Sequence, residues 1–195
     1  MGNLPFWTSE GQDILETKRQ GRWVMGFSKL PYQFLATKCD LPKFKMDDAS
    51  HTYLSNTVYY PGDLKWEEIK IEFVDPEDPQ YSSVRTLLGI IEQSGYHPLA
   101  NQNDRSFFSK KRACEVTGAV KIMQIANRSV GSASNLFEDV ATWTLHNAWV
   151  KAVEPGSLEY GKPDELKCSI TLRYDWATIE YPDGGQIFSK GTGTI

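Results

Sequence analysis

The segment 166–176 places the strongest constraint on what this chain can fold into. Its even-numbered positions are apolar from Leu166 to Trp176, whereas its odd-numbered positions, such as Lys167 and Asp175, are polar or charged. Because successive side chains of a β-strand point to opposite faces, this alternation predicts one long strand with a single buried face. Such a strand requires a sheet that covers a core.

Several other segments alternate with the same period of two and predict further strands. They cover residues 22–27, 33–39, 64–73, 114–122 and 143–149. Within 64–73 the phase of the alternation shifts at Glu67 and Glu68, which predicts a β-bulge. The chain is therefore expected to be mainly β.

One segment has the period of a helix. Apolar residues recur at positions i, i+3, i+4 and i+7 from Val84 to Ile91. Ser82 or Ser83 can cap the start of this helix, and Gly95 can end it. We expect a single amphipathic helix that flanks the sheets.

Length and composition fit one domain. The 195 residues are 40% hydrophobic and 24% charged, as is typical of globular proteins. We expect a single domain over residues 1–182, with a long polar loop or protruding hairpin at 41–60 between two strands. The glycine-rich segment 183–195 is expected to be a flexible tail.

The charge balance argues against several classes of protein. A formal net charge of -4 does not favour binding of nucleic acid through overall charge. No apolar run reaches the roughly 20 residues of a membrane span, and residues 1–7 lack the pattern of a signal peptide. We therefore expect a soluble chain without a membrane anchor. Cys39, Cys114 and Cys168 are odd in number and far apart, so they are expected to be reduced and mostly buried.

Catalytic and cofactor motifs are not apparent in the sequence. His51, His97 and His146 do not occur in the spacing of a metalloprotease, a hydrolase or a phosphate loop. The glycines form no dinucleotide-binding or nucleotide-binding loop. We expect no catalytic, metal-binding or cofactor-binding residues and no enzymatic activity. An enzyme that uses His146 or His97 with a nearby carboxylate is kept as an alternative.

A basic cluster at 105–112 contains two phenylalanines among its cations. Grooves that bind single-stranded nucleic acid use this combination. A solvated loop that leads into a strand is the favoured interpretation, because one cluster on an acidic chain is a small footprint. Contact with an acidic neighbouring subunit is a third interpretation. The acidic segment 63–78 supplies the counterpart, and complementary surfaces on one chain allow head-to-tail association.

Four segments occur in an order and spacing that resemble the tail tube proteins of contractile-tailed bacteriophages. They are Asn56–Gly62 with Trp66–Pro76, then Trp143–Val150, then Gly156–Tyr160 and finally Leu172–Ala177. Each segment alone is a strand pattern of low specificity, whereas the set spans more than half of the chain. One departure is Trp149-Val150 after an Asn-Ala pair, where family members often have an aromatic residue and then proline.

The resemblance implies both a fold and a mechanical function. The fold would be two packed antiparallel sheets flanked by a helix, with subunits that join into hexameric rings whose sheets merge into a barrel. Stacked rings would form the inner tube inside the contractile sheath and conduct double-stranded DNA into the host. The implied partners are other copies of the chain, the tail sheath protein, the tape-measure protein, and the baseplate and tail-terminator proteins. The implied location is the virion, and the host cytoplasm during assembly.

The resemblance also assigns roles to residues. The segment 41–60 would reach the adjacent ring, as extended loops do in similar tubes. The residues expected at contacts between rings or subunits are Lys43, Lys45, Asp47, Asp48, Tyr53, Tyr59, Tyr60, Lys110, Lys111 and Arg112. The residues expected to line the lumen are Glu67, Glu72, Glu115 and Thr117.

Other functions fit parts of the same pattern. Within the tube-like class, the alternatives are a tube initiator next to the baseplate and a protein similar to type VI secretion tubes. A monomeric β-barrel that binds a small ligand is a further alternative, and it predicts a closed interior cavity.

Overall fold

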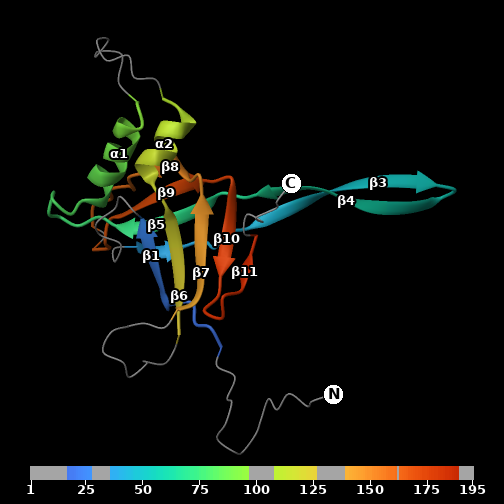
Figure 1. Cartoon of the computed structure of the whole chain (residues 1–195). Helices are drawn as coiled ribbons and strands as arrows, with labels where there is room; N and C mark the ends of the chain where they lie inside the picture. Colours follow the sequence, from blue (N-terminus) through green and yellow to red (C-terminus); the bar gives the residue numbers. More distant parts are fainter. Residues whose placement is uncertain (1–16, 28–35, 97–107, 127–138, 162, 189–195) are drawn as a thin grey trace, which may run out of the picture.

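The computed structural model describes residues 17–27, 36–96, 108–126, 139–161 and 163–188. Two antiparallel sheets pack against each other, two helices lie at one end of this body, and a two-stranded hairpin projects from it (Figure 1). The expected fold class, mainly β with two packed antiparallel sheets, is therefore confirmed.

The first sheet has five strands, and each is antiparallel to its neighbours. In spatial order they are β1 (Trp23–Phe27), β6 (Val120–Ile125), β7 (Asp139–His146), β10 (Trp176–Glu180) and β11 (Gln186–Ile187). Leu145 lies opposite both Val120 and Ala177, and all three side chains are buried. This alternation places one face of the sheet on the core.

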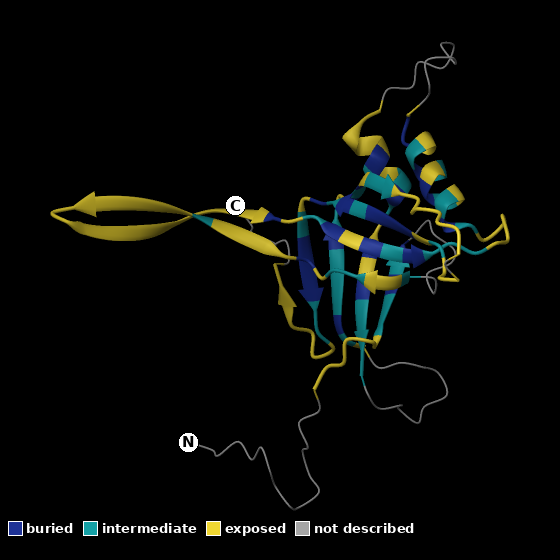
Figure 2. Ribbon diagram, turned by 180° about the vertical axis from the view of Figure 1, so that it is seen from behind, coloured by how far each residue is buried: buried dark blue, intermediate teal, exposed yellow. Residues whose placement is uncertain are grey.

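The second sheet has four antiparallel strands. In spatial order they are β2 (Ala36–Cys39), β5 (Ile69–Val74), β9 (Lys167–Arg173) and β8 (Trp149–Glu154). Ile71 lies opposite Ile170, and neither is exposed. In Figure 2 this sheet lies in front of the first one, so the core is the layer between the two sheets.

The hairpin consists of β3 (Phe44–Tyr53) and β4 (Asn56–Trp66). It leaves the body between β2 and β5 and extends far beyond the sheets (Figure 1). The segment 41–60 was expected to be a loop or protruding hairpin, and the structure shows paired strands that continue to Trp66. The interpretation as an irregular loop is therefore wrong, because its many polar residues are compatible with a strand exposed on both faces.

Helix α1 (Ser83–Gln93) begins and ends close to where its pattern predicts. The Ser82 hydroxyl caps the first turn by accepting a hydrogen bond from the Arg85 backbone N–H at 3.2 Å. Leu87 and Ile90 are buried and extend the core beneath the helix. Two prolines in the connection 75–82 separate this helix from β5.

A second helix, α2 (Lys110–Thr117), was not expected. Residues 114–117 were predicted to begin a strand because Cys114 and Val116 fit the same alternation as Val120 and Ile122. In the structure only the second half of that run is strand. The expectation of a single helix and the placement of Cys114 on a strand face are both wrong. The first turn of α2 is capped by the Ser109 side chain, which accepts from the Arg112 N–H.

Two of the predicted long strands change sheets in the middle. The run 166–176 is β9 only as far as Arg173, and after Tyr174 and Asp175 the chain continues as β10 in the other sheet. The run 143–149 divides in the same way between β7 and β8, at Asn147 with a φ of 55°. The burial pattern shifts by one residue at each crossing. Ala177 and Val150 lie opposite the buried Leu145 and Leu172 and face the core, whereas Trp176 and Trp149 lie on the other faces of their strands.

The predicted bulge at Glu67 and Glu68 is instead a short connection between β4 and β5. Its backbone remains paired, since the Glu67 N–H donates to the Lys43 carbonyl at 2.8 Å. The predicted tail 183–195 also contains structure, because Gln186 and Ile187 pair with β10. Residues 189–195 lie outside the described residues.

Candidate assembly surface

The β3–β4 hairpin is exposed along almost its whole length. Of its strand residues, only Asp47 and Trp66 are not exposed (Figure 2). At about 3.3 Å per residue, β4 extends about 35 Å. A two-stranded ribbon without its own core is marginally stable at best in water. The hairpin is therefore suited to contact another molecule.

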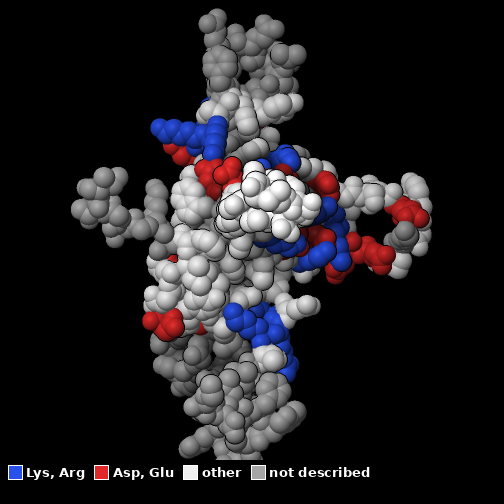
Figure 3. Space-filling view, turned by 90° about the vertical axis from the view of Figure 1, so that its right-hand side faces the viewer, with Lys and Arg blue, Asp and Glu red and all other residues white. Residues whose placement is uncertain are grey.

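The distal part of the hairpin carries no formal charge. None of residues 49–62 is Asp, Glu, Lys or Arg, although nearly a quarter of the whole chain is charged. Figure 3 looks toward the end of the hairpin and shows uncharged atoms in the centre with charged side chains around and behind them. Depletion of charge is typical of the central part of protein interfaces.

The strand register gives the distal hairpin two different faces. One face is aromatic and apolar in part, and it carries Ala49, His51, Tyr53, Asn56, Val58 and Tyr60. The other face is rich in hydroxyl groups, and it carries Asp48, Ser50, Thr52, Thr57, Tyr59 and Pro61. The hydroxyls of Thr52 and Thr57 lie 3.1 Å apart. Both faces can therefore form hydrogen bonds, and both also offer some apolar area.

The tip of the hairpin is a two-residue turn with unusual residues. Leu54 and Ser55 both have a positive φ, at 46° and 66°. The Leu54 side chain is 78% exposed. Turns of this kind normally use Asn and Gly, which accept a positive φ at low cost.

The base of the hairpin is fixed to the body by aromatic contacts. The ring of Trp66 lies 5.4 Å from that of Phe44, 5.4 Å from that of Phe188 and 5.9 Å from that of Tyr174, measured between centroids. Edge-to-face contacts of this kind stabilise beyond the burial of area. Burial raises the pKa of Tyr174 to about 12. The hairpin therefore has an anchored base and an unsupported tip.

The hairpin contains most of the residues predicted to contact other subunits. Lys45, Asp48, Tyr53, Tyr59 and Tyr60 are exposed on it. Lys43, just before β3, is exposed as well. Asp47 is partly buried and forms an ion pair with Lys65 across the strands.

The predicted basic contacts at 110–112 are partly engaged within the chain itself. The Lys110 ammonium donates to both carboxylate oxygens of Asp175, at 2.6 and 2.8 Å. The Arg112 Nε donates to the Gln93 carbonyl at 2.8 Å and so links α2 to α1. Lys111 is exposed. The interpretation of this segment as a solvated loop is wrong for Lys110–Arg112, which form the first turn of α2.

The predicted lumen residues do not share one surface. Glu115 and Thr117 lie on α2 and not on a strand, and Thr117 is buried, so its assignment to a lumen is wrong. Glu67 lies in the connection after β4. Glu72 lies on β5, on the side of the four-stranded sheet that faces away from the core.

This outer face of the four-stranded sheet neutralises much of its own charge. Lys38 lies 3.6 Å from Glu72, and Lys70 lies 2.7 Å from Glu154. The hydrogen bond from Lys70 and then that from Ser169 hold the pKa of Glu154 below its usual value. The same contact with Glu154 raises the pKa of Lys70. Ion pairs this exposed contribute little to stability, but they neutralise these four charges on the face.

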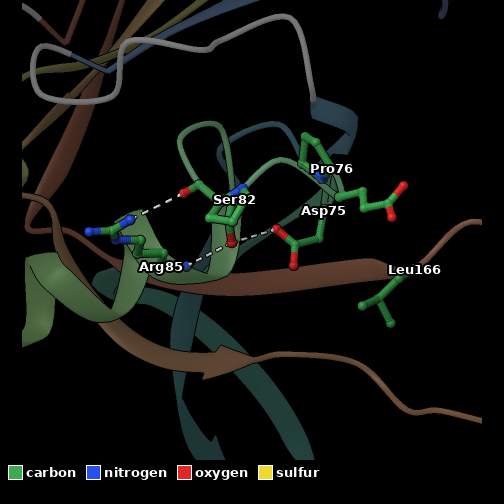
Figure 4. Close-up of a pocket in the computed structure, with 7 residues that line it drawn as sticks. Asp75, Pro76, Ser82, Arg85 and Leu166 are labelled. Carbon is green, nitrogen blue, oxygen red and sulfur yellow. Dashed lines mark hydrogen bonds between the residues drawn. The ribbon is translucent and has the colours of Figure 1, made fainter.

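A cleft lies at the end of β5 that is remote from the hairpin (Figure 4). It is lined by Asp75, Pro76, Glu77, Pro79, Ser82, Arg85 and Leu166. The Ser82 hydroxyl donates to Asp75 Oδ1 at 3.0 Å, and Arg85 Nη1 donates to the Pro79 carbonyl at 3.4 Å. The Asp75 N–H donates to the Leu166 carbonyl at 2.9 Å. These bonds hold the cleft between the start of α1 and the chain that enters β9.

The sequence motifs did not point to this cleft or to the hairpin tip. The sequence could have indicated the hairpin tip, because residues 49–62 include no Asp, Glu, Lys or Arg. No comparable signal marks the cleft, since its residues come from the segment 75–85 and from Leu166, far along the chain.

The histidines and cysteines show no catalytic arrangement in the described part of the chain. The His146 ring stacks on Trp176 at 4.8 Å, and its Nε2 lies 3.0 Å from the Thr178 hydroxyl. His51 lies on the hairpin, and His97 is outside the described residues. Among the residues described, no three or more His, Cys, Asp or Glu side chains are grouped to hold a metal ion. No helix in the described ranges is long and apolar enough to cross a membrane.

Comparison with known proteins gives matches at the level of structure alone. No family model matches the sequence, and no curated protein matches it. A chain in the tube-terminating cap of the anti-feeding prophage (AFP) aligns with a TM-score of 0.60 and 14% identity, over 89% of this chain and 97% of that chain. A chain in the sheath-tube complex of PVC, an extracellular contractile injection system, aligns with a TM-score of 0.58 and 12% identity, over 86% and 94%.

A further match lies in the baseplate of the same prophage. Its TM-score is 0.55 at 14% identity, and the alignment covers 84% of this chain and 95% of that chain. At such identities the likeness concerns the fold. This chain therefore has a fold found in contractile injection system assemblies, and the tail-tube-like fold implied by the sequence resemblance is confirmed.

Proposed function

We propose that this chain is a structural subunit of the inner tube of a contractile tail or injection machine. The proposal joins a fold shared with such assemblies to a hairpin that is built for contact with other molecules. Its finer form is the inner tube of a phage tail, in which hexameric rings stack inside the sheath and conduct double-stranded DNA.

The hairpin is the observation that carries the proposal. Its longer strand spans about 35 Å, and the hairpin lacks formal charge from residue 49 to 62 and exposes aromatic side chains on both faces. A hairpin of this kind would be a liability in a monomer, because exposed strands pair readily with other chains. In a tube it would bridge to the adjacent ring.

Sheet edges that have no further strand paired to them among the described residues support the formation of rings. The outermost strands of the two sheets are β1 and β11 in one, and β2 and β8 in the other. If the edges of neighbouring subunits join around an axis, closure of the ring removes the unpaired edges. We propose six subunits per ring, in line with the tail tube resemblance.

The outer face of the four-stranded sheet is our candidate for the lumen. Glu72 lies on it and is paired with Lys38, while Lys70 is paired with Glu154. Pairing these two lysines with carboxylates would weaken their hold on the phosphates of passing DNA, because each bound phosphate adds a salt-dependent contact. Glu67 lies next to this sheet and is kept as a second lumen candidate.

The proposed partners follow from the position of the tube in such a machine. They are other copies of this chain, the sheath, a tape-measure protein, the baseplate and a tail terminator. The proposed location is the virion, and the host cytoplasm during assembly. A tube initiator at the baseplate and a secretion-tube-like subunit share the fold, and they differ from a repeating subunit in how many rings they form.

Negative-stain electron microscopy with light-scattering mass tests the proposal. The purified full chain, with baseplate seeds added where needed, is expected to form six-fold rings and hollow tubes of uniform width. A chain that stays monomeric with seeds present would contradict the proposal. A single ring that never stacks would favour an initiator.

A shortened hairpin tests the role of that element. Asp48 lies opposite Pro61, so residues 49–60 can be replaced by Asn-Gly to close a short ribbon. We expect folded subunits that no longer stack. Tyr160→Ser is the matched control, because it removes a fully exposed aromatic side chain elsewhere and should leave stacking intact. Normal tubes from the shortened chain would refute the role.

A further inference from the structure

The residues at the hairpin tip do not favour the stability of an isolated subunit. Leu54 and Ser55 hold a positive φ, which costs on the order of 1 kcal/mol for each residue other than glycine. Asn-Gly would form the same turn at lower cost. The Leu54 side chain is also 78% exposed, so it contributes almost nothing to the core. Its apolar side chain would be stabilised on contact with a partner.

The tip and the cleft lie at opposite ends of the molecule. Strand β5 starts at Ile69, next to the base of the hairpin, and ends just before Asp75, which lines the cleft. In Figure 1 the hairpin extends to one side of the body, and the connection 75–82 lies on the other side. Two copies displaced along this direction would therefore bring the tip of one toward the cleft of the next. A contact of this type is head-to-tail and repeats without limit along an axis.

The chemistry of the tip matches that of the cleft. Pro76, Pro79 and Leu166 give the cleft an apolar lining that can accept the Leu54 side chain. Within the described part of the chain, the Glu77 carboxylate has no hydrogen-bond or ion-pair partner. The Ser55 hydroxyl and nearby amide groups of the tip are donors for it. The tip adds no charge that would need a partner in the contact.

We propose that the hairpin tip of one copy, Tyr53–Asn56, seats in the 75–85/166 cleft of a second copy, with Leu54 as its apolar anchor. This inference rests on the proposed function and names the surface that receives the hairpin. It also sets the polarity of the tube, because every ring presents tips on one side and clefts on the other.

Cross-linking between two introduced cysteines tests the contact directly. The full chain with Leu54→Cys and Glu77→Cys is assembled, treated with a short thiol cross-linker, and run on a denaturing gel. We expect a ladder of covalent oligomers, whereas each single variant gives none. The matched control combines Leu54→Cys with Lys121→Cys, which is exposed on the five-stranded sheet away from the cleft. The native thiols remain as a common background in all samples.

Two substitutions at the tip distinguish the effect of the Leu54 contact on stacking from the effect of backbone strain in the turn. Leu54→Asn relieves the backbone strain and removes the apolar anchor, so we expect a hairpin that is at least as well ordered but at least a tenfold loss in the extent of stacking. Ser55→Gly relieves strain at the neighbouring residue and keeps the anchor, so stacking should persist. Light scattering and electron microscopy measure stacking, and amide hydrogen exchange over residues 44–66 measures the order of the hairpin.

The outcomes distinguish this inference from the proposed function. Tubes that form without a Leu54–Glu77 cross-link would overturn the cleft contact and leave the tube function intact. A ladder of equal strength with the Lys121→Cys control, or normal stacking by Leu54→Asn, would overturn it as well. A monomeric chain with neither tubes nor ladder would overturn both.

Discussion

Lys110 on α2 is bound to Asp175 in the connection between β9 and β10 through two hydrogen bonds of 2.6 and 2.8 Å. Asn147, between β7 and β8, donates to the same carboxylate at 2.8 Å. Asp175 therefore joins α2 to both points at which the chain crosses between the sheets. We expect Asp175→Asn to lower the free energy of unfolding by about 1 kcal/mol, since the carboxylate is partly exposed. Denaturant unfolding measures this, with Lys111→Gln as the control.

The same substitution should change the response of the protein to acid. Burial opposes ionisation of Asp175, but hydrogen bonds from Lys110 and Asn147 outweigh it and hold its pKa below the ordinary value of 3.8. A group with a lowered pKa in the folded state stabilises above its unfolded pKa, and this stabilisation is lost as the pH falls through the folded one. Stability measured from pH 6 downward should therefore fall less steeply below about pH 4 in Asp175→Asn. If the wild-type chain and Asp175→Asn lost stability equally as the pH fell, this account would be contradicted.

Tyr174→Phe should not destabilise the protein. The Tyr174 hydroxyl is buried, and within the described residues it makes no hydrogen bond of normal geometry, although the Lys43 backbone lies close to it. Its removal leaves the ring contact with Trp66 at 5.9 Å in place. Because an unsatisfied buried hydroxyl is unfavourable, we expect a change between zero and about 1 kcal/mol in favour of the variant. Thermal unfolding checks this, and a clear loss of stability would mean that the hydroxyl is bonded in solution.

Gly156→Ala and Gly161→Ala form a matched pair. Both glycines have a positive φ, at 95° and 85°, so alanine costs backbone strain at either position. At Gly156 an added Cβ would also clash with the Lys167 carbonyl oxygen, whereas at Gly161 none of the described residues lies within 4 Å of it. We expect Gly156→Ala to cost at least about 1 kcal/mol more than Gly161→Ala. Equal effects in denaturant unfolding would show that the chain relaxes around residue 156.

The three thiols should differ in their reaction with alkylating reagents. Burial, and then the charge of Asp40, raises the pKa of Cys39 to about 12. Burial is also the main cause that raises the pKa of Cys168 to about 11. Since the thiolate is the reactive form, both should react slowly with iodoacetamide at pH 8 and quickly after denaturation. Cys114 is less buried and should react first, as mass spectrometry of the labelled peptides can show; rapid reaction of Cys168 would contradict this order.

Local patterns in the sequence predicted the elements that have one buried face. The alternation of Ile69, Ile71 and Phe73 became β5, and the helical spacing of Leu87 and its neighbours became α1. In these segments each apolar residue meets the same core, so the period of the pattern equals the period of the structure.

The same patterns did not predict where the chain crosses from one sheet to the other, and they did not predict the short helix α2. The alternation through Tyr174 does not show that β9 and β10 belong to different sheets, because that depends on pairing with distant strands. Helix α2 has only two buried residues, Ala113 and Thr117, so its pattern is weak beside that of a strand. The cleft depends on the position of Leu166 relative to the start of α1, and no local rule supplies that contact.

The crossings between the sheets have a consequence for how the chain folds. Strand β7 lies in the five-stranded sheet and β8 in the other, and the order is reversed from β9 to β10. Strand β5 cannot pair with β9 until β9 has been synthesised, because Ile71 and its partner Ile170 are separated by about half of the chain. Neither sheet can be completed first, and pairings this distant slow folding. During synthesis, the hairpin at residues 44–66 would therefore emerge well before the body that anchors it is complete, and the cell would have to keep that ribbon from pairing with its neighbours until the last strands arrive.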